Sequence, residues 1–265
     1  MPVEPTSEAI WRAVFLGQYP GMRRARHVLG LIPAKAYCKN CNAPFDGWAA
    51  PLMRLIGRGH SLKNPRFCNF CPNFFRNHPG GADVELSLLF VDVRGSTTLA
   101  EQMSAAEFSR LMNQFYAAAT RVMIKTDAFI DKLVGDEVIG LYFPGFAGPD
   151  YARMAVQAAQ NLLHVTAEDE PYGFRFAVGV GVHTGTAYVG TVSGAEGAVT
   201  DVTALGDDVN ITARLASRAG PGEALISEAT CAAARIDLGH LERRQLELKG
   251  KSQPIAVRVM RKSAG

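Results

Sequence analysis

The segment His-Pro-Gly-Gly-Ala-Asp at residues 78–83 divides the chain into two parts whose sequence patterns differ. Pro and Gly in succession interrupt both helices and strands, so this segment is expected to be a turn between two modules. Before it the chain is basic and holds four of its five cysteines, whereas after it apolar residues recur with strand and helix periods. We therefore predict two domains, at residues 1–80 and 84–262.

The apolar periodicity of the second part predicts an α+β fold. Residues 85–93 form an apolar run typical of a buried strand, and Ser104 followed by Glu107 is a capping box that opens a helix. Residues 129–143 predict two strands that turn at Gly135-Asp136. The remaining expected elements are strands at 174–185 and 186–192, helices at 150–165 and 209–219, and a final hairpin that turns near Gly250-Lys251. This order predicts helices packed on a mostly antiparallel sheet.

Charge is distributed as unevenly as the cysteines. The net charge of +3 combines +8 for residues 1–82, from eleven basic and three acidic residues, with −5 for the remainder. A basic module can pack on an acidic domain or bind an anionic partner, and both alternatives remain open. No apolar stretch is long enough to span a membrane, and the N-terminus lacks the pattern of a secretory signal, so we expect a cytoplasmic protein.

The four N-terminal cysteines predict a metal site. Cys38, Cys41, Cys68 and Cys71 form two Cys-x-x-Cys pairs, a spacing typical of four-thiolate coordination. Structural zinc is the first choice, and an iron–sulfur cluster is the alternative because four thiolates also suit it. Cys231 lies outside this pattern and is expected to be buried in a helix without a metal role.

Four polar residues of the second part could carry chemistry. Asp92 ends a strand before a Gly-containing turn, and Asp136 lies in the expected hairpin turn. Two such carboxylates on neighbouring strands could hold the metal pair of a phosphoryl-transfer site, although each alone could simply cap a turn. Asn210 and Arg214 lie four residues apart on one helix face, where they could orient a ribose and neutralise a phosphate, or form an ordinary polar surface.

In order and spacing, the motifs FVDVRGST, DKLVGDEV and LGDDVNITARL resemble the three signatures of the class III adenylyl/guanylyl cyclases. A fourth segment, LELKGKSQPIAV, is similar to the C-terminal hairpin of that family. The resemblance covers about residues 84–262 and implies a ferredoxin-like cyclase fold. No family is recognised for the four-cysteine module.

The resemblance assigns roles to single residues. It implies that Asp92 and Asp136 bind two Mg²⁺ or Mn²⁺ ions and that Asn210 and Arg214 stabilise the transition state. The residues that it implies for substrate binding are Lys132 and Thr203 at the purine, Lys249 at the terminal phosphates, and Gly95, Ser96 and Thr97 in the turn after Asp92.

Lys132 and Thr203 resemble the purine-selecting pair of class IIIb members, some of which respond to bicarbonate. An ammonium group can donate to a ring acceptor of adenine but would meet a protonated ring nitrogen in guanine. Related guanylate cyclases carry Glu and Cys at these positions, so the pair favours ATP. Selection depends more on Lys132, because the Thr203 hydroxyl could also donate to a guanine carbonyl.

The implied activity is adenylate cyclase, which forms 3′,5′-cyclic AMP and pyrophosphate from ATP in signal transduction. Family geometry places each site between two subunits, so a chain that holds every part implies a homodimer with two equivalent sites. The N-terminal metal module is expected to regulate the enzyme, as a structural brace or as a sensor. The alternatives are a guanylate cyclase and a non-catalytic, nucleotide-responsive regulatory protein; a diguanylate cyclase fits only the VGDEV segment.

Overall fold

The computed structural model describes residues 6–168, 175–193 and 200–262, and they form two compact units. The first unit contains residues 1–85, 143–149 and 186–206, and the second contains residues 86–142, 150–185 and 207–265. Strands β1 (Gly81–Val93) and β4 (Val178–Ser193) each contribute residues to both units. Phe174, the first residue of the strand segment expected at 174–185, lies outside the described residues.

The second unit is an α+β structure built on the long central part of the sheet. Its strands pair in the order β2-β3-β1-β4-β6-β8-β7. The pairs β1–β3, β2–β3, β6–β8 and β7–β8 are antiparallel, whereas β4–β6 is parallel. The strands besides β1 and β4 are β2 (Phe129–Val134), β3 (Glu137–Tyr142), β6 (Glu223–Ser227), β7 (Glu242–Leu246) and β8 (Ile255–Arg261). The helices are α5 (Ser96–Gln102), α6 (Ala105–Lys125), α8 (Tyr151–Thr166), α9 (Asp207–Arg218) and α10 (Glu228–Ala234).

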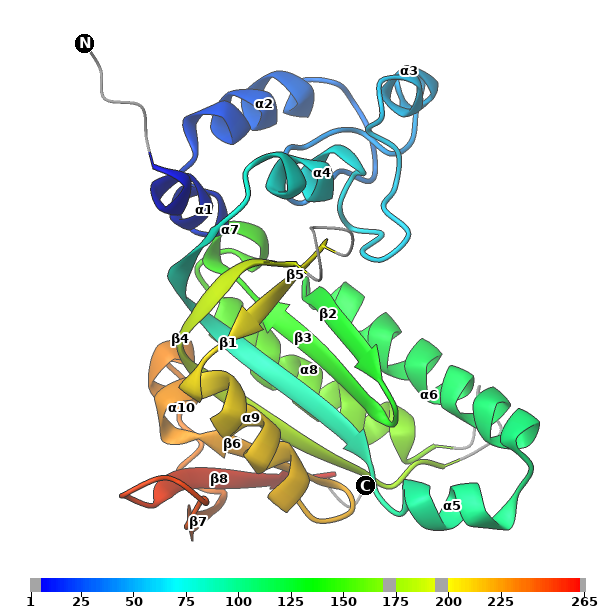
Figure 1. Ribbon diagram of the computed structural model, residues 1–265, viewed down its shortest axis with the longest axis vertical. Coiled ribbons are helices and arrows are strands. Elements are labelled where there is room, and N and C mark those ends of the chain that lie inside the picture. The colour runs from blue at the N-terminus through cyan, green and yellow to red at the C-terminus, as the bar shows by residue number, and fades with distance from the viewer. Residues whose placement is uncertain (1–5, 169–174, 194–199, 263–265) are drawn as a thin grey trace. The chain divides into compact units, whose positions relative to one another are not determined.

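Helices cover both faces of this sheet. Helix α8 lies behind the strands in Figure 1 and contacts α6 and α10, whereas α9 crosses in front of them. The capping box of α6 is present, because the Ser104 hydroxyl accepts from the Glu107 amide and the Glu107 carboxylate accepts from the Ser104 amide. The predicted α+β fold with packed helices is thus confirmed, as is the burial of Cys231 in α10.

Two differences from the expected elements have local causes. The segments expected as separate strands at 174–185 and 186–192 form one strand, β4, because Gly185 continues in extended conformation. Helix α2 (Pro20–Gly30) begins at the Pro20-Gly21 pair, in a segment for which no element was expected. Proline is well tolerated in the first turn of a helix, where its missing N–H has no partner to lose.

The first unit holds the short helices α1 (Ser7–Phe15), α2, α3 (Ala50–Leu55), α4 (Phe70–Asn77) and α7 (Pro144–Ala147), with the β4–β5 hairpin formed with β5 (Thr200–Leu205). Its core is aromatic: Phe15 stacks on Phe75 with ring centroids 5.1 Å apart and contacts Phe143 at 4.3 Å. Phe67 meets Phe146 edge to face at 4.9 Å. Residues 143–149 therefore complete the core of the N-terminal region.

Candidate active site

Asp92 and Asp136 lie side by side where β1 ends and β2 turns into β3. In the β1–β3 register Asp92 stands opposite Glu137, and the Val93 amide donates to the Asp136 carbonyl at 3.1 Å. The hydroxyl of Ser96 donates to the Asp136 carboxylate. The turn itself depends on Gly135, whose φ of 61° suits a residue without a side chain.

The electrostatics of this cluster favour a bound cation. Burial raises the pKa of Asp92 to about 6, and the Asp136 carboxylate adds to the rise while Arg94 opposes it. Burial, together with the charges of Asp92 and Asp136, raises the pKa of Glu137 to about 7. Carboxylate and hydroxyl oxygens are the donors that hard divalent ions prefer, so this group fits Mg²⁺ or Mn²⁺.

Arg94, which the sequence analysis did not single out, ties Asp92 to helix α9. Its Nη2 donates to Asp92 Oδ2 at 3.0 Å and to the Ala216 carbonyl at 2.6 Å, and its Nη1 donates to the Ser217 carbonyl at 3.2 Å. The guanidinium lies against Gly179, where a Cβ atom would come within 2.5 Å of it. The signal in the sequence was the position of Arg94, two residues after Asp92.

Tyr116 of α6 is a second residue that the sequence analysis missed. Its hydroxyl donates to the carbonyl of Gly135 and so fixes the turn that carries Asp136. Burial and the nearby Asp136 charge raise the pKa of Tyr116, which keeps the hydroxyl protonated as a donor. Only the pairing of α6 with the β2–β3 turn shows this role, since the helix periodicity does not distinguish Tyr116.

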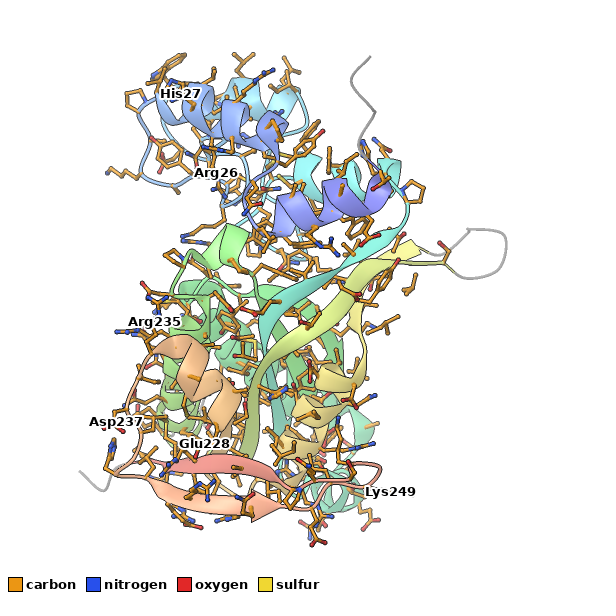
Figure 2. The ribbon with its side chains drawn as sticks, turned by 90° about the vertical axis from the view of Figure 1, so that its left-hand side faces the viewer. Arg26, His27, Glu228, Arg235, Asp237 and Lys249 are labelled. Carbon is orange, nitrogen blue, oxygen red and sulfur yellow. The ribbon has the colours of Figure 1, made fainter. Side chains whose placement is uncertain are left out.

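The other polar site residues of the second unit gather on α9 and the β7–β8 connection. Arg214 approaches Gly250, with guanidinium nitrogens 3.9 Å from the position that a Cβ there would take. Lys249 precedes that glycine and is exposed on the connection (Figure 2), and Asn210 is exposed on α9. An ion pair between Lys251 and Asp207 holds the connection to the start of α9. Asn210 and Arg214 thus lie on α9, with Arg214 near the connection that carries Lys249, whereas Asp92 and Asp136 lie on β1 and the β2–β3 turn.

The remaining predicted substrate residues lie on other elements. Lys132 is half-buried in β2 opposite Ile139, and Thr203 is buried in β5 opposite Gly190, in the first unit. Gly95 takes a φ of 75° just before α5, and Thr97 is exposed in the first turn of that helix.

The glycines of β4 allow α9 to approach closely. A Cβ at Gly181 would lie 2.4 Å from the Ala216 amide nitrogen, and one at Gly185 would lie 2.2 Å from Asp208 Oδ2. His183 between them contacts Ser227 Oγ at 2.9 Å and Asp208 Oδ1 at 3.1 Å. Burial lowers the pKa of His183, and its contacts with Ser227 and Asp208 suit a structural role.

Cys38, Cys41, Cys68 and Cys71 converge in the first unit, with all four Sγ atoms within 4.8 Å of one another. The Sγ pairs Cys38–Cys71 and Cys41–Cys68 are both 3.6 Å apart. Tetrahedral zinc with four thiolates would set sulfur atoms about 3.8 Å apart, so the four side chains fit a single ion. A cluster that binds each thiolate to a different iron requires more widely spaced sulfurs.

Donors around these sulfurs would stabilise thiolates. Arg58 Nη1 donates to Cys41 Sγ at 3.2 Å, and the Cys68 amide donates to Cys38 Sγ at 3.3 Å. The pKa of the Cys38 thiol lies below its usual range because the neighbouring cysteines hydrogen-bond to its sulfur. This surrounding polarity matches the outer shell of a metal centre.

Residues 82–260 match the protein family described as "Adenylate and Guanylate cyclase catalytic domain". The chain belongs to this cyclase family. An adenylate cyclase of Anabaena cylindrica is 32% identical over 136 residues, which cover 49% of this cyclase and 26% of the Anabaena protein. This cyclase therefore spans about a quarter of that relative.

Two solved cyclases share the fold of the catalytic region. The guanylyl cyclase Cya2 superposes with a TM-score of 0.60 at 26% identity, over 68% of this cyclase and 93% of Cya2. The adenylyl cyclase CyaB of P. aeruginosa superposes with a TM-score of 0.59 at 27% identity, over 68% of this cyclase and 96% of CyaB. The cyclase fold predicted from the four motifs is confirmed.

Proposed function

We propose that this cyclase converts ATP to 3′,5′-cyclic AMP and pyrophosphate at sites shared between two identical chains. The observation that carries the proposal is the meeting of Asp92 and Asp136, backed by Ser96 and Tyr116, in a chain of the cyclase family. A relative and a solved structure that are named adenylate cyclases support the choice of reaction.

In the proposed reaction the ribose 3′-oxygen attacks the α-phosphorus, and the bond to the oxygen of the leaving pyrophosphate breaks. When bound, two divalent ions would acidify the 3′-hydroxyl and neutralise the triphosphate. Asp92 and Asp136 would hold them, and an ionised Asp92 carboxylate could accept the hydroxyl proton. Asn210 would orient the ribose, and Arg214 would neutralise charge that develops on the reacting phosphate.

Adenine selection is assigned to Lys132 with Thr203, and phosphate binding to Lys249 with the turn at Gly95, Ser96 and Thr97. Incubation of the full chain with ATP or GTP, with Mg²⁺ or Mn²⁺, tests the assignment. We expect cyclic AMP from ATP and at least about tenfold less product from GTP, because a missing hydrogen-bond partner at a site built for it is costly. Equal turnover of both nucleotides would contradict the adenine assignment, and no product from a folded dimer would favour a nucleotide-responsive regulator.

Exchange of the purine pair sharpens this test. Lys132→Glu combined with Thr203→Cys should shift the product ratio towards cyclic GMP, because a carboxylate accepts from guanine donors. Lys132→Arg with Thr203 unchanged is the matched control, since it retains the positive charge. If the exchange reduces both activities equally, the two residues hold the fold and do not select the purine.

We also propose that the four cysteines bind one zinc ion and that this module regulates the cyclase. Two contacts within the first unit support a route to the β4–β5 hairpin that carries Thr203. Lys63 Nζ pairs with Asp201 Oδ1 at 3.0 Å, and the Thr191 amide donates to the Gly80 carbonyl at 2.8 Å. A change at the metal site could thereby alter the position of the adenine contact.

Metal analysis of anaerobically purified protein tests the ion, and kinetics of Lys63→Met tests the route. We expect one zinc per chain and no visible absorbance, whereas a coloured protein containing iron and sulfide would mean a cluster. Lys63→Met should leave the zinc content unchanged but alter KM for ATP. An unchanged KM would mean that the contact between Lys63 and β5 does not carry regulation from the zinc site.

A further inference from the structure

Helix α3 of the first unit has an apolar face that the protein does not cover. The spacing of Trp48, Leu52, Leu55 and Ile56 places them on one side of the helix and its flanks, with 75%, 52%, 83% and 53% of their surfaces exposed. The opposite side of the same segment is already occupied, since Ala49, Ala50 and Met53 are buried. The segment therefore has two apolar faces, of which one packs inward and one faces outward.

The exposed face continues beyond the helix onto the end of α2. The Lys35 amide donates to Asp46 Oδ1 at 2.7 Å, and a Cβ at Gly47 would lie 3.2 Å from the Pro33 carbonyl. These contacts hold the chain after α2 against the residues before α3, so Leu31 and Trp48 flank one junction. Leu31 is 73% exposed. Apolar patches of this kind on otherwise polar surfaces mark binding sites.

The charge around this face is mostly positive. Residues 46–82 contain five basic residues and one acidic residue, Asp46, and Arg54 is exposed within α3 itself. Arg23 and Arg24 are exposed on α2. Apolar side chains that insert, with arginines that reach an anionic layer, are the pattern of helices that lie in a membrane interface.

We propose that the α3 face, defined as Trp48, Leu52, Leu55 and Ile56 with Arg54, docks the protein on the surface of an anionic lipid bilayer. Tryptophan suits the interface because its ring is apolar and its N–H is polar. A second copy of the chain is a poorer occupant, because two modules of like charge would repel each other. Nucleic acid is also a poorer one, since the centre of the face is aliphatic rather than cationic.

This docking is peripheral. Among the helices that the structure describes, none has the length and apolar content to cross a bilayer. The proposal therefore predicts binding that weakens as salt screens the charge, rather than insertion that resists it.

Fluorescence of the full chain with lipid vesicles tests the proposal directly. The chain has two tryptophans, and Trp11 is 0% exposed, so a blue shift on adding vesicles would report Trp48. We expect the shift with vesicles of phosphatidylcholine and phosphatidylglycerol, little shift with phosphatidylcholine alone, and loss of the shift in Trp48→Phe. An equal shift with both vesicle types, or none, would overturn the proposal.

Vesicle flotation with variants tests the face. Leu52→Ser with Leu55→Ser, and separately Arg54→Glu, should each lower the bound fraction by about tenfold. Leu62→Ser is the matched control, because Leu62 is fully exposed on the loop after α3 and outside the face. Thermal unfolding and zinc content should be unchanged in all variants, since the replaced side chains are exposed.

Two further results would overturn the assignment. If Leu62→Ser loses binding as strongly as the double variant, the α3 face is not the docking site. If the double variant changes the mass of the protein in solution without lipid, the face joins two copies of the chain.

Discussion

Single residues decide how the carboxylates of Asp92, Asp136 and Glu137 are held. Asp92, Asp136 and Glu137 place three acidic groups in one partly buried region, and burial raises the pKa values of Asp92 and Glu137. Arg94 offsets this at Asp92 while binding two carbonyls at the end of α9. The residue therefore acts as a positioning residue between a proposed metal ligand and the helix that carries Asn210 and Arg214.

Arg94→Ala should lower the thermal stability of the metal-free protein, by about 1–2 kcal/mol, because it removes three hydrogen bonds and leaves Asp92 beside two other carboxylates. Mn²⁺ should raise the melting temperature of this variant more than that of the wild type, since the ion then replaces the lost positive charge. Thermal unfolding with and without Mn²⁺ measures both effects. Arg94→Lys is the control that keeps the charge; an unchanged melting temperature in Arg94→Ala would contradict the role.

At the scale of elements, the strands β6, β7 and β8 are joined by a cluster of ion pairs as well as by their ladders. Although burial opposes its ionisation, hydrogen bonds from Arg244, the Gly220 amide and Arg261 lower the pKa of Glu223 to about 2. The Glu223 side chain is only 12% exposed. The depressed pKa means that this contribution to stability is present above the unfolded value near 4.5 and is lost as pH falls towards 2.

Glu223→Gln should destabilise the protein by about 2 kcal/mol near neutral pH and by less at about pH 3, because below about pH 4.5 the unfolded wild type gains a proton that folded Glu223, with a pKa of about 2, has not yet bound. Urea unfolding of both proteins at the two pH values gives the difference. Glu242→Gln is the control, because Glu242 binds the same two arginines but is more exposed. A destabilisation independent of pH would mean that Glu223 acts through packing rather than charge.

The elements that the sequence predicted well are those with a strong local signal. Neighbouring residues alone determine three of them: the capping box at Ser104, the turn at Gly135-Asp136 and the hairpin at Gly250. The paired cysteine spacing likewise predicted a cluster that the structure brings together. Arg94 and Tyr116 were missed because their partners are carbonyl groups far along the chain, which no side-chain pattern records.

At the scale of the whole molecule, residues 1–82 do not form a complete hydrophobic core by themselves. Phe143 and Phe146, which lie within the cyclase match at 82–260, are 0% and 5% exposed against Phe15 and Phe67. Gly145 lies so close to α1 that a Cβ there would come within 2.5 Å of the Phe15 carbonyl. Packing within the first unit therefore joins residues from both sides of the domain boundary that was predicted at residues 80–84.

A chain that begins at residue 83 should consequently be much less soluble or less stable than the full chain, because it exposes both phenylalanines, at a cost of about 2 kcal/mol each. Sedimentation and thermal unfolding of the two proteins measure the difference. Phe143→Ser with Phe146→Ser in the short chain should recover part of the solubility. A short chain as stable as the full one would show that the catalytic region closes its core without residues 1–82.

The placement of the proposed site residues on different elements leads to the last prediction. Arg94 binds Asp92 at the C-terminal end of α9, whereas Asn210 lies seven residues earlier than Ser217, about 10 Å along the helix axis. Arg214 approaches the β7–β8 connection at Gly250. The proposed metal ligands and the proposed transition-state residues thus lie on different elements, and in a site shared by two chains each set would come from a different chain.

Asp92→Ala and Arg214→Ala should each form an inactive homodimer, since every site would lack one essential group. In a mixed dimer, the site that takes its carboxylates from the Arg214→Ala chain and its arginine from the Asp92→Ala chain is complete. Random pairing makes about half of the dimers mixed, and each mixed dimer has one working site out of two. Co-expression should therefore restore about a quarter of wild-type activity. Co-expression of Asp92→Ala with Asp136→Ala is the control: both changes affect the carboxylate group, so neither site of a mixed dimer is complete. Activity in the control mixture, or no activity in the first mixture, would mean that each chain forms its own site.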